Sequence, residues 1–146
     1  MVNVKIKKIK ENAVIPTKST FHAAGFDLYA CLDSDSIEIM PQTNIKISTG
    51  LAFELPQGYM SLIFARSGIA TKESLRPANC VGIIDSDYRG EYIVPLFNDS
   101  NEIKVIKNNE RIAQLVIMPY PEITFNEVDE LSTTSRGENG FGSSGK

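Results

Sequence analysis

The chain has few of the residue types on which many functional sites depend. It contains no tryptophan, one histidine and two cysteines in 146 residues. The histidine, His22, is expected at the surface, which leaves a serine or cysteine triad without a base. Cys31 and Cys80 lack metal-ligand spacing and are too few for a secreted disulfide scaffold. We therefore expect a reducing compartment.

Long apolar runs and a basic excess are also missing. No apolar run reaches membrane-spanning length, and the first residues alternate lysine with valine or isoleucine instead of forming a signal-peptide core. The net charge of −3 argues against broad attraction to nucleic acid. The early lysines fit protection of an edge strand better than a binding patch. The sequence predicts a soluble, intracellular or cytoplasmic protein without membrane or direct nucleic-acid partners.

What is present predicts a single all-β domain. A chain of this length with 42% apolar residues can bury a core of its own. Apolar residues alternate at the strand period, and prolines punctuate the gaps. Denser apolar runs predict central strands buried on both faces; they cover residues 59–65, 81–84, 92–97 and 112–118. We predict a jelly-roll-like β-barrel or sandwich with one short helix over residues 67–74, capped by Ser67.

The composition changes abruptly after Leu131. Serine and threonine lead into a glycine-rich stretch with little to bury, so we predict a domain over residues 1–131 and a flexible arm over residues 132–146. GFGSSGK from Gly140 has P-loop spacing, but no strand leads into it and no helix follows. A floppy tail is the alternative. Phe141 argues against it, because stacking of a ring on a base contributes about 1–3 kcal/mol.

Polar residues gather directly behind the apolar run that ends at Ile84. Asp85, Asp87 and Tyr88 precede the next run, so the segment resembles a hairpin with a polar tip. Aspartates behind a strand are most often turn residues, and Asn79 has the same alternative. Two carboxylates with a tyrosine and an arginine nevertheless favour a shaped polar pocket.

Three other positions carry polar groups beside strand-like runs. The segment 66–68, Arg-Ser-Gly, is either a solvated strand end or a cradle for phosphate. Gln114 lies inside an apolar run and must find a partner in the core or on a ligand. Asp27 lies between Phe26 and Leu28, where it either faces water by alternation or binds something.

Taken together, five segments resemble the motif set of the trimeric dUTPases, the deoxyuridine triphosphate nucleotidohydrolases. They are AGFDLYA from Ala24, ARSGIA from Ala65, GIIDSDYRGEY from Gly82, RIAQL from Arg111 and RGENGFGSSG from Arg136. One departure is Asn109, where that family usually has glycine; asparagine tolerates positive φ next best. The resemblance implies hydrolysis of dUTP to dUMP and pyrophosphate, with Mg²⁺, by a homotrimer whose active sites are shared between copies.

The resemblance also implies roles for single residues. Asp85 is the general base, Tyr88 packs on the deoxyribose and refuses a 2′-hydroxyl, and Asp27 holds Mg²⁺ through water. The uracil edge is read by the Asn79 side chain and by main chain near Ile83, Ile84 and Ile93. The remaining substrate contacts come from Arg66, Ser67, Gly68, Gln114, Arg136, Phe141 and Gly142, the last three on an arm that closes over a neighbouring copy's site.

Two other classes of function stay open at this point. A dCTP deaminase has a related fold and would release ammonia. A non-catalytic jelly-roll protein that binds nucleotide would shift its melting temperature with ligand but turn nothing over.

Overall fold

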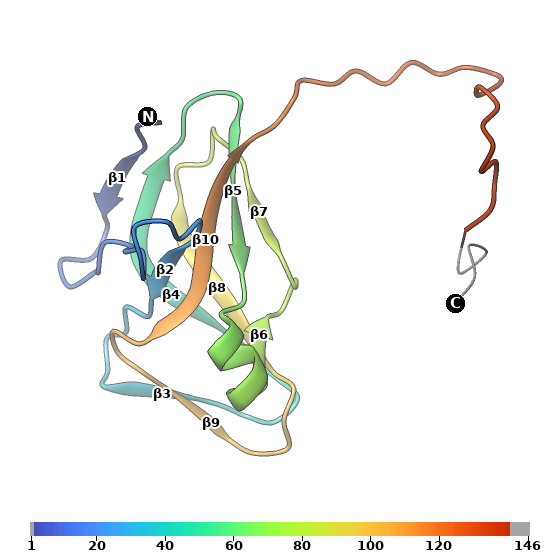
Figure 1. Cartoon of the computed structure of the whole chain (residues 1–146). Helices are drawn as coiled ribbons and strands as arrows, with labels where there is room; N and C mark the ends of the chain where they lie inside the picture. Colours follow the sequence, from blue (N-terminus) through green and yellow to red (C-terminus); the bar gives the residue numbers. More distant parts are fainter. Residues whose placement is uncertain (1, 141–146) are drawn as a thin grey trace.

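The computed structural model describes residues 2–140, which form short strands and one helical turn (Figure 1). In chain order these elements are β1 (Lys5–Lys8), β2 (Phe26–Tyr29), β3 (Ser36–Ile39), β4 (Asn44–Glu54), β5 (Tyr59–Phe64), η1 (Ile69–Glu73), β6 (Leu75–Pro77), β7 (Gly82–Ile84), β8 (Glu91–Asn98), β9 (Lys104–Lys107) and β10 (Arg111–Pro119). The antiparallel sheets run β1-β4-β8-β6, β2-β10-β5-β7 and β3-β9. The all-β, jelly-roll-like prediction is confirmed.

The core lies between the two four-stranded sheets and follows strand alternation. Tyr92, Val94 and Leu96 of β8 are fully buried, as are Leu28 of β2 and Leu115 of β10. The prediction that the dense runs are buried on both faces is wrong for this chain. Ile63 and Leu115 point into the core, so their neighbours in β5 and β10 point outward and are only partly buried. The outward face is apolar and carries Met60, Leu62, Phe64, Val116 and Met118.

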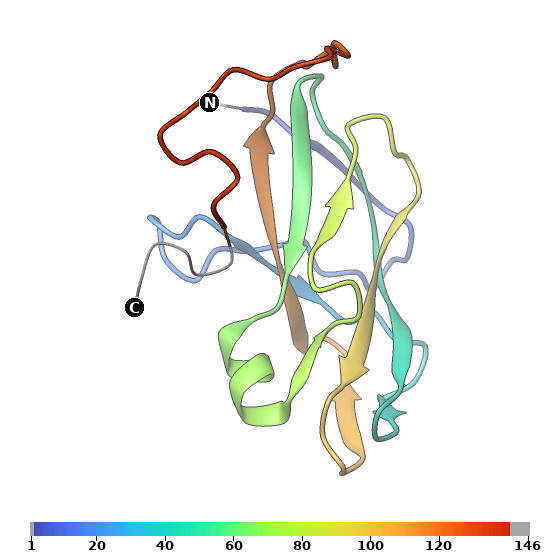
Figure 2. The same cartoon turned by 90° about the vertical axis from the view of Figure 1, so that its right-hand side faces the viewer.

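The segment around Asp85 connects two sheets and is not the hairpin that the sequence suggested. β7 pairs with β5, whereas β8 pairs with β4 and β6. Figure 2 shows β7 and β8 as separate strands joined by a long loop. Residues 85–90 therefore pass from one sheet to the other, which leaves space between the two strands.

The predicted helical turn is present, and its beginning differs from the prediction. Its N-cap is Gly68, and no side chain caps it, so the Ser67 cap was wrong. Instead the Thr71 hydroxyl donates to the Ser67 carbonyl at 2.7 Å. The turn ends at Ser74, which has a φ of 56°.

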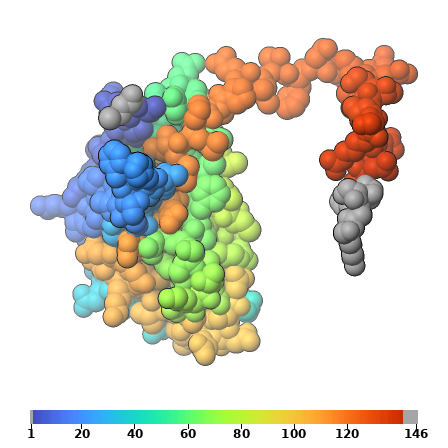
Figure 3. Space-filling view, in the orientation of Figure 1, coloured from blue at the N-terminus to red at the C-terminus, as the bar shows by residue number. Residues whose placement is uncertain are grey.

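Beyond Pro119 the chain leaves the body of the protein. Residues 120–140 contain no strand or helix and run away from the sheets, as the red end of Figure 3 shows. Large apolar side chains on this segment are exposed, among them Phe125 at 95% and Leu131 at 87%. The extended segment thus begins before residue 131. The division into a domain over residues 1–131 and an arm over residues 132–146 stays a prediction. Phe141 and Gly142 lie outside the described residues. Within residues 2–140, no helix is long and apolar enough to cross a membrane.

One buried polar pair offers a test of the core. The Tyr92 hydroxyl lies 2.8 Å from Ser61 Oγ, and the ring packs on Phe53 with centroids 4.3 Å apart. Burial raises the pKa of Tyr92, and the Ser61 hydrogen bond opposes that shift. Tyr92→Phe is expected to lower the free energy of unfolding by about 1–2 kcal/mol, because the buried Ser61 hydroxyl loses its partner. Urea unfolding measures this change.

The control for this prediction removes both hydroxyls. Ser61→Ala in the Tyr92→Phe background is expected to recover part of the loss, since no polar group is then left unpaired. Unchanged stability of the single Tyr92→Phe variant would contradict the prediction.

Candidate functional site

A hollow opens between β7 and β8, where the two sheets part. In the described structure β7 is an edge strand, and β6 pairs only with residues 96–98 of β8, so residues 91–94 of β8 face β7 without a strand between them. The hollow has a volume of about 280 Å³. Its lining consists of Ile83, Ile84, Asp85, Tyr88, Glu91, Tyr92 and Ile93. The fold thus brings together five of the residues that the sequence predicted for the site.

Tyr88 is held against the main chain at one end of this hollow. Its hydroxyl donates to the Glu91 carbonyl at 3.2 Å. A Cβ at position 90 would collide with the Tyr88 hydroxyl and ring, so any residue larger than glycine would have to displace the ring from this position. Tyr88 is 46% exposed, and its ring forms an accessible wall of the hollow.

Asn79 and Asp85 lie at the two ends of β7. Asn79 is exposed in the turn before the strand, with Nδ2 3.4 Å from the point a Cβ would occupy on Gly82. Asp85 is exposed directly behind the strand, and its carbonyl accepts a hydrogen bond from Tyr88 N at 3.3 Å. Asp85 also borders a second, polar hollow lined by residues such as Asp87, Arg89 and Tyr120. Its carboxylate is therefore available to a ligand or to water.

A second cluster is centred on Asp27 of β2, in the sheet β2-β10-β5-β7. Phe26 and Leu28 point toward the core, as alternation predicts, but Asp27 is only 3% exposed because two arginines cover it. Arg66 Nε lies 2.8 Å from Oδ1, and Arg111 Nη1 lies 3.3 Å from Oδ2. The reading of Asp27 as a water-facing residue is wrong. Arg111 was not identified as a partner from the sequence.

Gln114 lies beside this cluster. It is opposite Asp27 in the strand register and half-buried, and its Oε1 lies 3.2 Å from the point a Cβ would occupy on Gly25. Among residues 2–140 its side-chain amide has no hydrogen-bond partner. The amide can therefore serve a ligand, which is one of the two outcomes expected for a polar group in an apolar run.

The contacts of Asp27 indicate that its carboxylate holds two guanidinium groups in place and does not bind a metal ion directly. Both carboxylate oxygens already bond to arginines, and two positive charges surround one negative charge. Across the described residues no group of three or more His, Cys, Asp or Glu side chains could hold a metal ion. A hard cation here would need oxygen ligands from another source, such as phosphate. The water-mediated role of Asp27 stays a prediction.

Neutralising Asp27 is expected to destabilise the protein. Asp27→Asn keeps an acceptor for Arg66 but removes the charge between the two guanidinium groups. We expect a loss of about 1–2 kcal/mol in the free energy of unfolding, after allowing for solvent screening at the half-exposed Arg111. Thermal or urea unfolding measures it. The matched control is Asp33→Asn, whose exposed pair with Lys10 should contribute nothing measurable, and an equal effect of both variants would contradict the prediction.

The two clusters do not meet within one chain. Asp85 follows Ile84, which is opposite Ser61 near the start of β5, whereas Arg66, Ser67 and Gly68 follow the end of β5. The intervening strand separates them by about 20 Å at about 3.3 Å per residue. Arg136 is farther away on the extended segment, where its Nε donates to the Asn139 carbonyl at 3.0 Å.

Comparison with known proteins gives these groups a common context. The family model for dUTPase matches residues 11–145. The deoxyuridine 5′-triphosphate nucleotidohydrolase of Nautilia profundicola is 50% identical over 145 residues, which is 99% of this chain and 100% of that protein. The chain belongs to the dUTPase family. The nucleotidohydrolase of the same name from a Hydrogenobaculum species is 45% identical over 140 residues and covers 96% of each chain.

Solved dUTPase structures resemble this chain along most of its length. A mutant dUTPase of Staphylococcus bacteriophage 80alpha with dUpNHpp has a TM-score of 0.89 at 30% identity and covers 99% of both chains. A mutant dUTPase from phage phi11 of S. aureus, described with a coordinated structural Mg(II) ion, has a TM-score of 0.77 at 25% identity over 88% of this chain and 97% of that one. The sequence did not identify the contacts of Arg111 and Glu91, because their partners Asp27 and Gly50 lie 84 and 41 residues away along the chain. It also did not identify the contact of Gly90 with the Tyr88 ring.

Proposed function

We propose that this protein is a dUTP diphosphatase that hydrolyses dUTP to dUMP and pyrophosphate, which limits uracil incorporation into DNA and supplies dUMP for dTMP synthesis. The observation that carries the proposal is the hollow between β7 and β8, where Asp85, Tyr88 and the open strand edges lie together in a chain that belongs to the dUTPase family. The relatives' name and dUpNHpp, whose formula is that of dUTP with an imido group in its phosphate chain, support the same substrate.

The open strand edges account for selection of the base. Uracil offers O4 as an acceptor and N3–H as a donor, which main-chain groups near Ile83, Ile84 and Ile93 and the Asn79 amide can complement. Cytosine reverses both groups and would leave the polar partners, once covered by the base, unpaired. Tyr88 closes the space beside the sugar, which would exclude a 2′-hydroxyl.

The chemistry is attack of water on the α-phosphorus. Asp85 takes a proton from the water while the water oxygen bonds to the α-phosphorus. The bond between the α-phosphorus and the α–β bridging oxygen breaks, and pyrophosphate leaves. A positioned base contributes about 10²–10⁴ in rate. Arg66, Ser67, Gly68, Gln114 and Arg136 would hold the phosphate oxygens. Asp27 would hold Mg²⁺ through water, and the ion would supply positive charge that offsets the negative charge of the triphosphate.

A complete site requires more than one copy of the chain, and we propose a homotrimer. The roughly 20 Å between Asp85 and Arg66 supports sharing, since one triphosphate cannot reach both within a single copy. The outward apolar face of β5 and β10 gives neighbouring copies a surface to cover. Large unpartnered apolar faces of this kind mark interfaces.

The extended segment gives a second reason to expect assembly. A groove beside β1 is lined mainly by apolar residues that include Val4, Ile6, Phe26, Phe53 and Ile117. Residues 122–130 of the extended segment carry four acidic side chains between apolar ones, while β1 carries three lysines. The charges and the apolar pattern favour this segment of a second copy as the occupant of the groove, which would direct Arg136, Phe141 and Gly142 toward a neighbouring site.

The location that fits this function is the cytoplasm. Both cysteines are free thiols, Cys31 buried and Cys80 exposed, which supports a reducing compartment.

Pyrophosphate release across the deoxynucleoside triphosphates and UTP, with and without Mg²⁺, tests the proposed activity. We expect release from dUTP with Mg²⁺, and little from dCTP, dTTP or UTP. Ammonia from dCTP would instead identify a deaminase, and a melting shift without turnover would identify a nucleotide binder. Light scattering that gives the mass of one chain at working concentration would contradict the shared site.

A further inference from the structure

Glu91 is the first residue of β8. Its Oε1 accepts the main-chain N–H of Gly50 at 2.7 Å and also a short hydrogen bond from the Ser48 hydroxyl. The side chain is only partly exposed and borders the hollow beside Tyr88. One carboxylate oxygen thus takes two hydrogen bonds from the neighbouring strand.

The side chain of Glu91 bonds to a β-bulge in β4. The register between β4 and β8 shifts between Ser48 and Ala52, and Gly50 has a φ of 68°. A Cβ on Gly50 would come within 2.8 Å of Ala13 Cβ and 2.9 Å of Cys31 Sγ, so the bulge is closely packed. The Gly50 carbonyl accepts hydrogen bonds from Ile9 N and Lys10 N. The carboxylate is therefore tied to a point that packing and main-chain bonds already hold fixed.

The main chain of Glu91 holds the Tyr88 ring, which is the proposed wall beside the sugar. Its carbonyl accepts the Tyr88 hydroxyl at 3.2 Å, and Gly90 leaves room for the ring to lie against the main chain. The Tyr88 ring has few other supports: it is 46% exposed, and its centroid is 6.3 Å from that of Tyr92. The ring is placed mainly by where the main chain at position 91 lies.

We infer that Glu91 is a positioning residue for substrate selection: by tying the start of β8 to the β4 bulge, it sets the place of the Tyr88 ring and so the exclusion of ribonucleotides. A steric wall discriminates only as strictly as it is held, because a displacement of an ångström opens room for one hydroxyl. The inference rests on the proposed dUTP hydrolysis. It concerns selectivity, whereas Asp85 concerns rate.

Substitutions at position 91 separate the anchor from the charge. Glu91→Ala removes the acceptor, and Glu91→Gln keeps an amide oxygen in its place. We expect Glu91→Ala to reduce the ratio of kcat/KM for dUTP to kcat/KM for UTP by about tenfold or more. The value of kcat/KM for UTP should rise, and the KM for dUTP should rise while kcat for dUTP changes little. Glu91→Gln should keep the ratio close to that of the wild type.

A second pair of variants keeps the inference testable if Glu91→Ala does not fold. Ser48→Ala removes one of the two donors and should lower the ratio by about threefold. Tyr88→Phe removes the link from the other side. In the double variant Glu91→Ala/Tyr88→Phe the two losses should not multiply, because both break the same connection.

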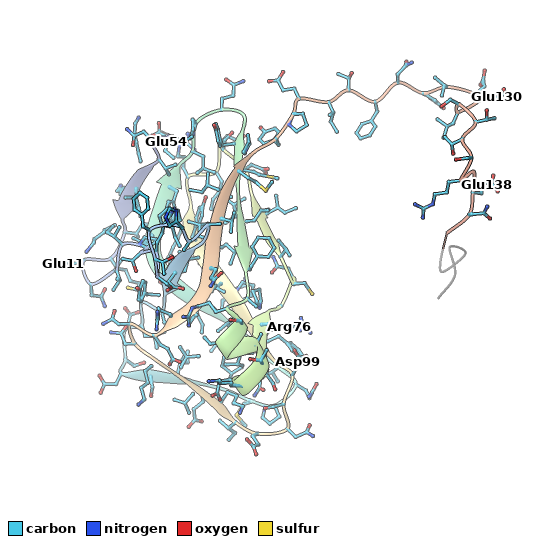
Figure 4. The ribbon with its side chains drawn as sticks, viewed as in Figure 1. Glu11, Glu54, Arg76, Asp99, Glu130 and Glu138 are labelled. Carbon is cyan, nitrogen blue, oxygen red and sulfur yellow. The ribbon has the colours of Figure 1, made fainter. Side chains whose placement is uncertain are left out.

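The control is Glu54→Ala on β4, the strand that also carries Ser48 and Gly50. Glu54, labelled in Figure 4, pairs with Lys5 at 2.8 Å on the exposed surface and does not line the hollow, so its loss should leave the ratio unchanged. A Glu91→Ala protein that folds and assembles but keeps the wild-type ratio within about twofold would overturn the inference.

Hydrogen exchange in the absence of nucleotide distinguishes this inference from the proposed function. Glu91→Ala should speed exchange in residues 85–92, and Glu54→Ala should not. A wild type that does not hydrolyse dUTP would contradict the proposed function. Unchanged exchange in Glu91→Ala would contradict the inference that Glu91 anchors this segment.

Discussion

Asp85→Asn is expected to bind dUTP and to lose about 10²–10⁴ in kcat. Asparagine keeps the size and polarity of the side chain at the end of β7, but it cannot accept the proton from the attacking water. Because the contacts that we propose for the base and the sugar are left in place, the binding constant for dUTP should change little. Pyrophosphate release measures kcat, and calorimetry with Mg²⁺ and dUTP measures binding.

Asp87→Asn is the matched control for this prediction. Asp87 is exposed two residues farther along the same loop and borders the second hollow but not the one between β7 and β8. Its loss should leave most of the activity. Full activity in Asp85→Asn would remove Asp85 from the role of base, and equal losses in both variants would point to a shared electrostatic effect.

A chain shortened to end at Thr134 should fold and assemble but lose about 10²-fold or more in turnover. The cut removes Arg136 and the glycine-rich main chain that we propose to hold the triphosphate, while every strand of the described structure remains. Activity assays and light scattering measure the two properties. Unimpaired turnover would refute a closing role for the arm.

Mixing two inactive proteins tests sharing of the site directly. The shortened chain supplies Asp85 without an arm, and the full-length Asp85→Asn chain supplies an arm without the base. After unfolding and joint refolding, some trimers should contain sites with both parts, so activity should rise well above the sum of the separate proteins. If each arm served its own chain, no mixed site could be complete and no gain would appear.

Local patterns in the sequence predicted the strands well and the pairings poorly. Apolar residues alternate in β1, β3 and β4. In β3 this alternation follows burial, with Ile37 half-buried and Ile39 buried, whereas every residue of β1 is exposed. The loop after Ile84 resembled a hairpin because strands adjacent in sequence usually pair, yet β7 pairs with the preceding β5. Burial on both faces was expected from composition, but a single chain buries only one face of β5 and β10.

The site was predictable as a set of residues and less so as a set of contacts. Asp85, Tyr88 and Ile93 meet at one hollow, as the motif around them suggested. The partners of Asp27, in contrast, come from 39 and 84 residues away, and the Gly50 partner of Glu91 from 41 residues away. No local pattern contains such distances, so these ion pairs and anchors required the fold.

The open edge of β7 has a consequence beyond catalysis. An unpaired edge flanked by exposed isoleucines, Ile83 and Ile93, can recruit a stray strand from another molecule as readily as it can receive a pyrimidine. A nucleotide bound at the proposed site would occupy the main-chain groups that such a strand would use. Nucleotide should therefore delay aggregation on heating by more than its effect on the melting temperature accounts for, because it would cover the same strand edge.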